Sequence, residues 1–177
     1  IRVGTHEANI ATAVEAIRAG AADAGRDPAA VRLGAVFHTV LVDDKARALT
    51  MAKSMAAGYY EYSPALFDPP RLAWTGKDPE TLKRERKVWP DFHHAVDLEA
   101  SGRVVDFLPE IAADAFSLRG GPGEVADRLV DVLRRAPAEF DYVVLHPIPN
   151  PPSPDDPERG YTARMAREVL PRVRTAL

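Results

Sequence analysis

Hydrophobic positions recur with two different periods along the chain, and each period predicts an element. From 8 to 24 they lie three or four residues apart, which predicts an amphipathic helix that ends at Gly25. The segment 31–42 is apolar on both of its alternating faces, which is typical of a strand buried on both sides in a parallel sheet. The segment 140–147 has the same pattern and predicts another buried strand. A short strand is also expected at the start of the chain, in residues 1–4.

Three further helices are predicted from their start and stop signals. Asp44 offers an N-cap for a helix over about 45–57. Pro122 suits the first position of a helix over 122–135, whose apolar residues follow a helical spacing. A last helix is expected over about 157–176. Strands and helices therefore alternate, which is the βαβ pattern of an α/β fold with a parallel sheet.

The stretch 58–112 differs from the rest because it mixes aromatic residues, prolines and charges without a sustained period of 2 or 3.6. Long excursions of this kind in compact enzymes are usually functional lids or binding loops, or else disordered linkers. The aromatic content argues against a linker. We therefore predict an inserted, lid-like excursion with short helices.

The number of strands limits the fold. A closed eight-stranded barrel of strands and helices takes about 250 residues, whereas the chain has 177. We therefore predict one α/β domain over 1–177 that forms part of such a barrel. The chain starts on a strand with Ile1 and without methionine, and the expectation is that it is a piece of a longer protein.

Composition excludes several classes of partner. The formal net charge is -3, so the chain lacks the basic excess with which proteins usually approach nucleic acid or anionic membranes. No apolar run approaches the roughly 20 residues that a membrane span needs. The absence of cysteine excludes disulfides and thiolate metal sites and favours a reducing compartment, with the cytoplasm as the default.

Several segments resemble the carboxyl-terminal half of luciferase-like monooxygenases. They are the helix end "AGAADAGRDPAAVRLG", the loop and helix start "RGGPGEVADRLVDVL", the strand "FDYVVLHPIP" and the closing "EVLPRV". The resemblance is strongest to the branch that uses coenzyme F420, a deazaflavin. It implies the carboxyl-terminal portion of a (β/α)8 TIM-type barrel. Residues 1–3, 31–42 and 140–146 would be its sixth, seventh and eighth strands, with the long insertion after the seventh.

Barrel enzymes keep their active sites at the carboxyl ends of the strands, and this rule selects the candidate residues. His38 and His146 are the predicted catalytic residues, with a role in packing as the alternative for each. Gly4, Thr5 and His6 follow the first strand at a helix start, where backbone N–H groups and a hydroxyl suit an anion. They are the predicted cofactor-binding residues, and an ordinary loop is the alternative.

The excursion supplies a second set of candidates. Trp89, Phe92, His93 and His94 combine two aromatic rings with two titratable groups and are predicted to cover a flavin-like ring or the substrate. These aromatic rings would alternatively anchor the excursion to the barrel. No metal is expected, because the spacing of Asp91, His93 and His94 fits no standard zinc pattern.

The function implied by the resemblance is hydride transfer between coenzyme F420 and a small organic substrate. An FMN-dependent monooxygenase of the same fold is the alternative, and a non-catalytic half-barrel or flavin-binding scaffold is a third reading. Barrels of this kind often pair, so a homodimer is expected. A fold alone does not choose among these activities.

Overall fold

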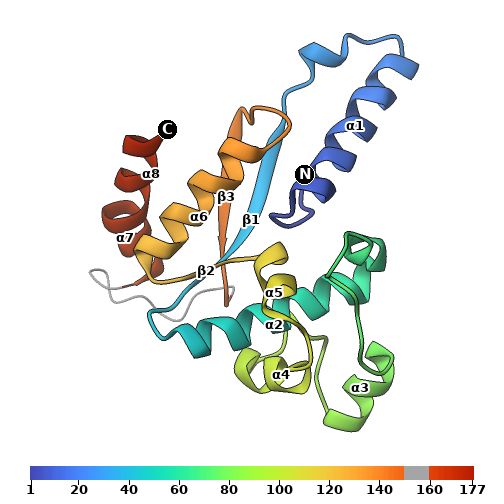
Figure 1. Cartoon of the computed structure of the whole chain (residues 1–177), viewed down its shortest axis with the longest axis vertical. Coiled ribbons are helices and arrows are strands. Elements are labelled where there is room, and N and C mark those ends of the chain that lie inside the picture. Colours follow the sequence, from blue (N-terminus) through green and yellow to red (C-terminus); the bar gives the residue numbers. More distant parts are fainter. Residues whose placement is uncertain (150–159) are drawn as a thin grey trace.

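The computed structural model describes residues 1–149 and 160–177. Within them, three strands form one parallel sheet in the order β2-β1-β3 (Figure 1). Strand β1 spans Gly34–Leu41, β2 spans Leu118–Gly120 and β3 spans Tyr142–Pro147. The predicted parallel sheet is therefore confirmed, although the short β2 was not predicted.

The start of the chain also lies along β1. The Ile1 amino group donates to the Gly34 carbonyl oxygen, and the Val36 N–H donates to the Ile1 carbonyl oxygen at 2.9 Å. These two bonds on either side of Ala35 are those of a parallel ladder. Residue 1 and β3 thus flank β1 on opposite edges. Residues 1–4, which were predicted to be a strand, form no regular strand, so this single ladder contact is what remains of the expected first strand.

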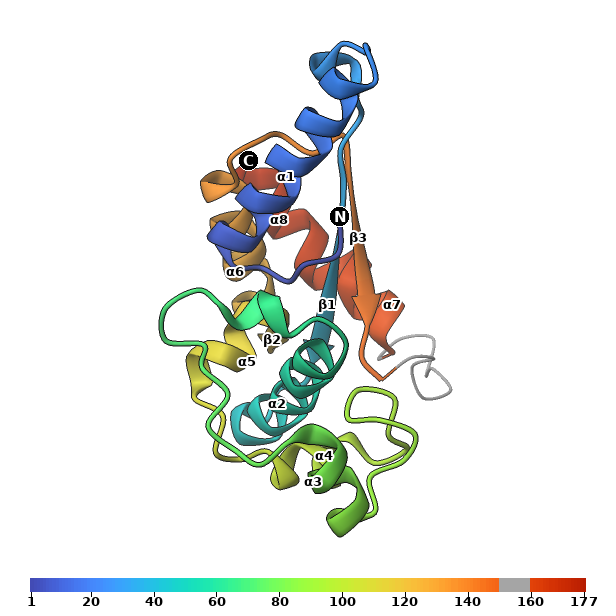
Figure 2. The ribbon, with the colours of Figure 1, turned by 90° about the vertical axis from the view of Figure 1, so that its right-hand side faces the viewer.

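Helices cover one face of the sheet. Helix α1 spans Glu7–Asp23, α6 spans Pro122–Arg135 and α8 spans Leu170–Ala176, and all three lie on the same side of β1 and β3 (Figure 2). Their apolar stripes pack on the odd-numbered residues of the two strands, among them Phe37 and Leu145. Burying a side chain such as Phe37 contributes about 1.5–3 kcal/mol, so this layer is the main core.

A group of helices lies beyond the carboxyl ends of the strands (Figure 1). Helix α2 spans Lys45–Tyr62, α3 spans Pro79–Arg86, α4 spans Leu98–Val104 and α5 spans Glu110–Phe116. An aspartate caps the start of α2, α3 and α4, because its carboxylate accepts an N–H of the first turn. Helix α2 continues to Tyr62 and so includes the first residues of the predicted excursion.

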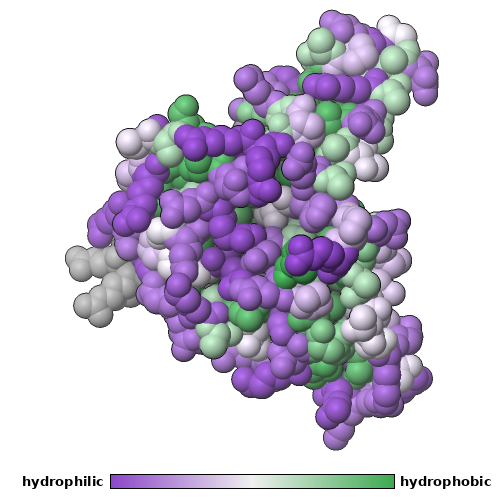
Figure 3. All heavy atoms as spheres, viewed as in Figure 1, coloured by the Kyte–Doolittle hydropathy of each residue, from purple (hydrophilic) through white to green (hydrophobic). Residues whose placement is uncertain are grey.

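The excursion has an apolar core of its own. Phe67, Leu72 and Phe92 are buried together with Phe116 of α5 and residues of α2. The face in Figure 3 is mostly hydrophilic, and hydrophobic residues show over this helical part and beside α1. The excursion is therefore a packed layer on α2, which holds its side chains in fixed positions relative to the sheet.

The remaining elements are short. Two 3-10 turns span Pro28–Ala30 and Pro64–Phe67, and α7 spans Tyr161–Arg164. A π-helical turn, Met165–Val169, joins α7 to α8. The last helix was expected from about residue 157, but 150–159 lie outside the described residues. In the described parts of the chain, no helix has both the length and the apolar composition that a bilayer crossing requires.

Candidate active site

His38 and His146 lie side by side on the face of the sheet that faces away from α1 and α6. The two residues are register partners on β1 and β3, and their ring centroids are 5.1 Å apart. Side chains alternate between the two faces of a strand, and the neighbours of His38 and His146, Phe37 and Leu145, point into the helix-covered core. The structure therefore brings the two predicted catalytic histidines together.

The contacts of His38 fix which ring nitrogen carries its proton. Arg2 Nη2 lies 2.8 Å from His38 Nε2, and the Tyr59 hydroxyl lies 3.0 Å from His38 Nδ1. A guanidinium only donates hydrogen bonds, so Nε2 accepts and Nδ1 carries the proton of the neutral ring. The Nδ1–H then donates to the Tyr59 oxygen, and Arg2 is held against the sheet by an imidazole.

Burial keeps these histidines neutral near pH 7. Burial and the nearby Arg2 guanidinium lower the pKa of His38 to about 3. Burial lowers the pKa of His93 to about 4, although the Asp91 carboxylate opposes that shift. The pKa of His146 is also lowered, mainly by burial and then by Arg2. At neutral pH these rings are therefore uncharged, and Arg2 supplies the positive charge.

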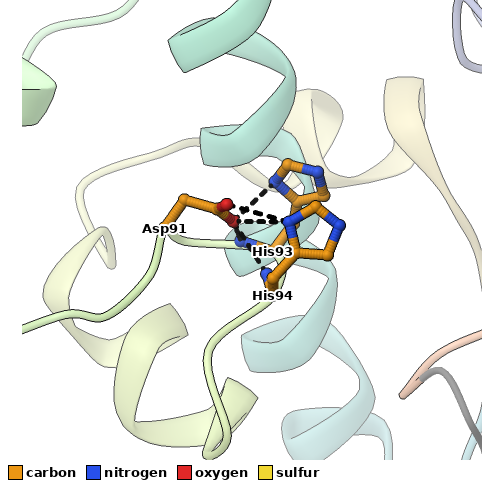
Figure 4. A group of neighbouring side chains, drawn as sticks. All are labelled: Asp91, His93 and His94. Carbon is orange, nitrogen blue, oxygen red and sulfur yellow. Dashed lines mark hydrogen bonds and ion pairs between the residues drawn. The ribbon is translucent and has the colours of Figure 1, made fainter.

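The excursion brings a second group of side chains to the same place. His94 Nδ1 lies 2.8 Å from Asp91 Oδ2, and His93 Nδ1 lies 3.0 Å from Asp91 Oδ1 (Figure 4). The Tyr62 hydroxyl donates to Asp91 Oδ2 at 3.0 Å. The hydrogen bonds of Asp91 to His94 and Tyr62 outweigh its burial and lower its pKa, so Asp91 is an anion behind the two imidazoles.

Two cavities in the described part of the chain lie between the histidines of the sheet and those of the excursion. One has a volume of about 250 Å³ and the other of about 110 Å³, and both are lined by Arg2, His38, His93 and His94. His146 lines the smaller cavity, and Tyr59 and Tyr62 line the larger one. The carboxyl ends of β1 and β3 and the excursion thus meet around one basic pocket, as expected for a barrel site.

Arg2, whose side chain is exposed, gives the lining of the pocket its positive charge. None of the ion pairs within residues 1–149 and 160–177 involves Arg2, although its side chain stays charged at any ordinary pH. Its neighbour His38 is neutral, and Asp91 does not line either cavity. A phosphate or a carboxylate would therefore find an uncompensated guanidinium there.

Gly4, Thr5 and His6 line neither cavity and are engaged in the fold, although the Gly4 backbone N–H reaches the Tyr59 hydroxyl. Gly4 has a φ of +80°, and a Cβ there would lie 2.3 Å from the Ala115 carbonyl oxygen. The Thr5 N–H donates to that oxygen at 2.8 Å, and the Thr5 hydroxyl donates to the Asp114 carbonyl oxygen at 2.6 Å. His6 Nδ1 accepts from the Ala8 N–H and caps α1. The two hydrogen bonds that Thr5 donates join the first loop to α5.

Two of the four candidates in the excursion lie away from the pocket. Phe92 is fully buried in the core of the excursion and contacts Trp74 edge to face. Trp89 is 80% exposed and lies beside Lys83 and Lys87 in a separate hollow. Phe92 thus fits the alternative weighed for these rings, that of anchoring the excursion, and His93 and His94 are the ones that reach the pocket.

Sequence reasoning missed Arg2 as part of the site, and for Tyr59 it favoured plain packing over a place in the substrate wall. Arg2 stands in the short apolar start of the chain and Tyr59 near the end of α2, so they meet only through the fold. Arg2 carried one signal, because it is a charged residue within a short predicted strand. In the structure its side chain is exposed. The signal for Tyr59 was its place in a cluster with Tyr60 and Tyr62, and its ring does pack, stacking on Phe116 with centroids 4.7 Å apart.

Comparisons with known proteins agree with this architecture. A family model described as luciferase-like monooxygenase matches residues 2–139, and no curated protein matches the chain. The F420-dependent tetrahydromethanopterin reductase from Methanopyrus kandleri is 20% identical with a TM-score of 0.54, and the match covers 95% of this chain and 43% of that one. A riboflavin lyase crystallised with modified FMN and riboflavin is 22% identical with a TM-score of 0.45, over 96% of this chain and 37% of that one. The chain therefore has the fold of part of the reductase and spans less than half the length of either structure.

Proposed function

Because the chain belongs to the luciferase-like monooxygenase family, we propose that it supplies one side of an oxidoreductase pocket that binds coenzyme F420 and a small organic substrate. One observation carries the proposal: Arg2, His38 and His146 gather at the carboxyl ends of parallel strands. In barrel enzymes this is the end where cofactor and substrate bind.

The residues of the pocket fit such a cofactor. F420 and FMN both carry a phosphate, and Arg2 offers a guanidinium without an ion-pair partner in the described residues. The described cavities, of about 110 and 250 Å³, are smaller than the roughly 300–1,000 Å³ of a typical cofactor site. The face of β3 beside them is open, because Val144 is 45% and Tyr142 57% exposed. This chain thus fits as one wall of a larger pocket.

Bound F420 would supply the chemistry of hydride transfer, and the protein would supply orientation and charge. His38 holds its proton at Nδ1, where it bonds Tyr59, and its Nε2 positions the Arg2 guanidinium. Arg2 would hold the negative charge of the ligand. His146 lies beside His38 with a lowered pKa, so its neutral ring is the one suited to accept a proton from the substrate. His93 and His94 would close the pocket against water.

An FMN-dependent monooxygenase is the second candidate, since the description of the family itself names that reaction class. The same Arg2 contact would serve the phosphate of FMN. The two candidates differ in the cofactor that binds and in the use of oxygen, and both can be measured.

The test is a fluorescence titration of the protein, once with F420 and once with FMN. The proposal expects saturable F420 binding that is at least about tenfold tighter than FMN binding, a difference of about 1.4 kcal/mol. Tight binding of FMN alone would establish the monooxygenase candidate instead. Binding of neither cofactor would overturn both candidate functions and favour a non-catalytic scaffold protein.

A further inference from the structure

We propose that Asp91, His93 and His94 form a binding site for a divalent transition-metal ion such as zinc, cobalt or iron(II). One carboxylate and two imidazoles each offer a ligand atom, and the three atoms lie within 4.8 Å of one another. This site is separate from the proposed cofactor contacts, so its existence does not depend on which cofactor the protein uses.

The geometry is close to that of a three-ligand site. Both imidazoles turn their Nδ1 atoms toward the carboxylate of Asp91 (Figure 4), at 3.0 Å for His93 and 2.8 Å for His94. Ligands at about 2.0–2.2 Å from a metal lie roughly 3–3.5 Å from one another in a tetrahedral arrangement. Small movements of the two rings would therefore admit an ion between the three atoms.

The donor set indicates which ions fit. Imidazole nitrogen suits zinc, copper, iron and nickel, whereas calcium and magnesium prefer oxygen ligands. When two histidines and one carboxylate bind one side of an ion, further coordination positions of the ion stay open. This is the arrangement of non-haem iron sites and of catalytic zinc sites. The site is thus predicted to select transition metals over magnesium and calcium.

Packing against α2 positions the His93 side chain as a ligand. A Cβ at Gly58 would lie 2.1 Å from His93 Nδ1, so the glycine makes room for the ring. His93 Nδ1 is buried and, within the described residues, has no hydrogen-bond partner, although Asp91 Oδ1 is 3.0 Å away. A buried nitrogen without a partner is costly, and a metal ion on its lone pair would satisfy it.

The Asp91 ligand is held in place from two sides. Its Oδ1 accepts the backbone N–H groups of His93 at 3.1 Å and His94 at 2.8 Å, and its Oδ2 accepts the Tyr62 hydroxyl. Hydrogen bonds of this kind orient metal-binding carboxylates. The separation of the three residues along the sequence matches no zinc pattern, but the tight turn at 91–94 places their side chains on one side.

The open positions of the ion would face the substrate. His93 and His94 also line the cavities that contain His38 and Arg2. An ion between His93 and His94 would therefore stand at the edge of the proposed active site, where it would bind a carboxylate or hydroxyl oxygen of a small molecule. The ligand class assigned to the site is thus a metal ion with an oxygen-bearing substrate.

The test is a cobalt(II) titration of the protein, prepared without a polyhistidine tag, followed by its d–d absorption. We expect saturable binding of one ion and a rise in the unfolding temperature, because an ion that binds only the folded state stabilises it. His94→Ala is expected to weaken binding by at least about tenfold. His94 suits the test because its side chain is 60% exposed and its removal leaves the core intact.

Asp91→Asn provides the second variant, since asparagine can still accept the two backbone N–H groups, and it is expected to weaken binding by a similar factor. His6→Ala is the matched control, because His6 caps α1 away from the cluster, and it should bind cobalt as the parent protein does. Equal loss in His6→Ala and His94→Ala, or no saturable binding in the parent protein, would overturn the proposal. None of these results depends on F420 or FMN, so the metal site and the proposed function fail separately.

Discussion

His38 and His146 are register partners on adjacent parallel strands, and their imidazole rings meet edge to face with centroids 5.1 Å apart. Parallel pairing places both side chains on one face of the sheet, and the helix-covered core occupies the other face. Arg2 and the excursion close around this pair. The proposed active site depends on this pairing of the two histidines.

The tautomer of His38 can be measured directly. Because Arg2 donates to Nε2, the structure predicts a neutral ring with its proton on Nδ1. Nitrogen-15 NMR of labelled histidine should show this form at pH 7. In Arg2→Ala the ring loses its fixed donor, and the signal should shift toward the other tautomer. A proton on Nε2 in the parent protein would contradict the proposed contact.

Removal of the Tyr59 hydroxyl tests the other side of the same ring. In Tyr59→Phe the His38 Nδ1–H loses its acceptor while it stays buried. We expect the free energy of unfolding to fall by about 1–3 kcal/mol, measured by urea denaturation. Tyr60→Phe is the control, since Tyr60 stacks on Trp74 instead, and a similar loss there would argue against the His38 contact.

Acid should destabilise the fold through His38. Its pKa is about 3 in the folded protein against about 6.5 in the unfolded chain. Between these values the unfolded state binds a proton that the folded state does not. The contribution of the neutral His38 ring to the free energy of unfolding is therefore fully present above pH 6.5 and is lost as the pH falls toward 3. The loss is on the order of 2 kcal/mol by pH 5.

The measurement is the unfolding free energy at pH 7 and pH 5 for the parent protein and for His38→Gln. The variant should lose less stability between the two values than the parent does. His6→Gln is the control, because His6 is only partly buried, and it should keep most of the acid sensitivity. An unchanged pH dependence in His38→Gln would show that other groups cause the acid loss.

Two glycines in helices should respond to alanine in opposite ways. Gly58 lies under the His93 ring, and a Cβ there would meet the ring at 2.1–2.6 Å. Gly20 in α1 has open space where a Cβ would stand, with no atom within 4 Å. Alanine usually stabilises a helix interior by roughly 0.5–1 kcal/mol relative to glycine. Thermal unfolding should therefore show a gain for Gly20→Ala and a loss for Gly58→Ala.

A gain in both variants would mean that His93 moves aside without cost. It would also weaken the case for the metal site, because that site needs His93 to stay in place. Cobalt binding by Gly58→Ala gives an independent check, since a displaced imidazole would lower the affinity even if the protein remains stable.

The sequence predicted the elements well where one period dominates. The helix expected over 8–24 is α1, Glu7–Asp23, and the helix over 122–135 is α6. The strands β1 and β3 lie within the predicted segments because both faces of each are apolar. The prediction was less accurate at 58–62, where aromatic residues obscured the continuing helical spacing of α2.

The site was only partly predictable. The rule that barrel sites lie at strand ends selected His38 and His146, and the structure brings them together. The same rule selected Thr5, whose N–H and hydroxyl instead donate to α5, and Gly4, which packs closely against Ala115 of α5. Arg2 was missed because a contact with His38 over 36 positions leaves no local pattern.

The most direct test of the central claim compares F420 binding by the full-length protein, by its Arg2→Ala variant and by Arg32→Ala. Arg32 is an equally charged residue that pairs with Asp141 before the start of the strands. The account predicts that Arg2→Ala weakens binding by about tenfold or more, since a hydrogen bond to a charged group contributes about 1.5–3 kcal/mol, and that Arg32→Ala binds as the parent does. Unchanged affinity in Arg2→Ala would contradict the assignment of this pocket to the cofactor.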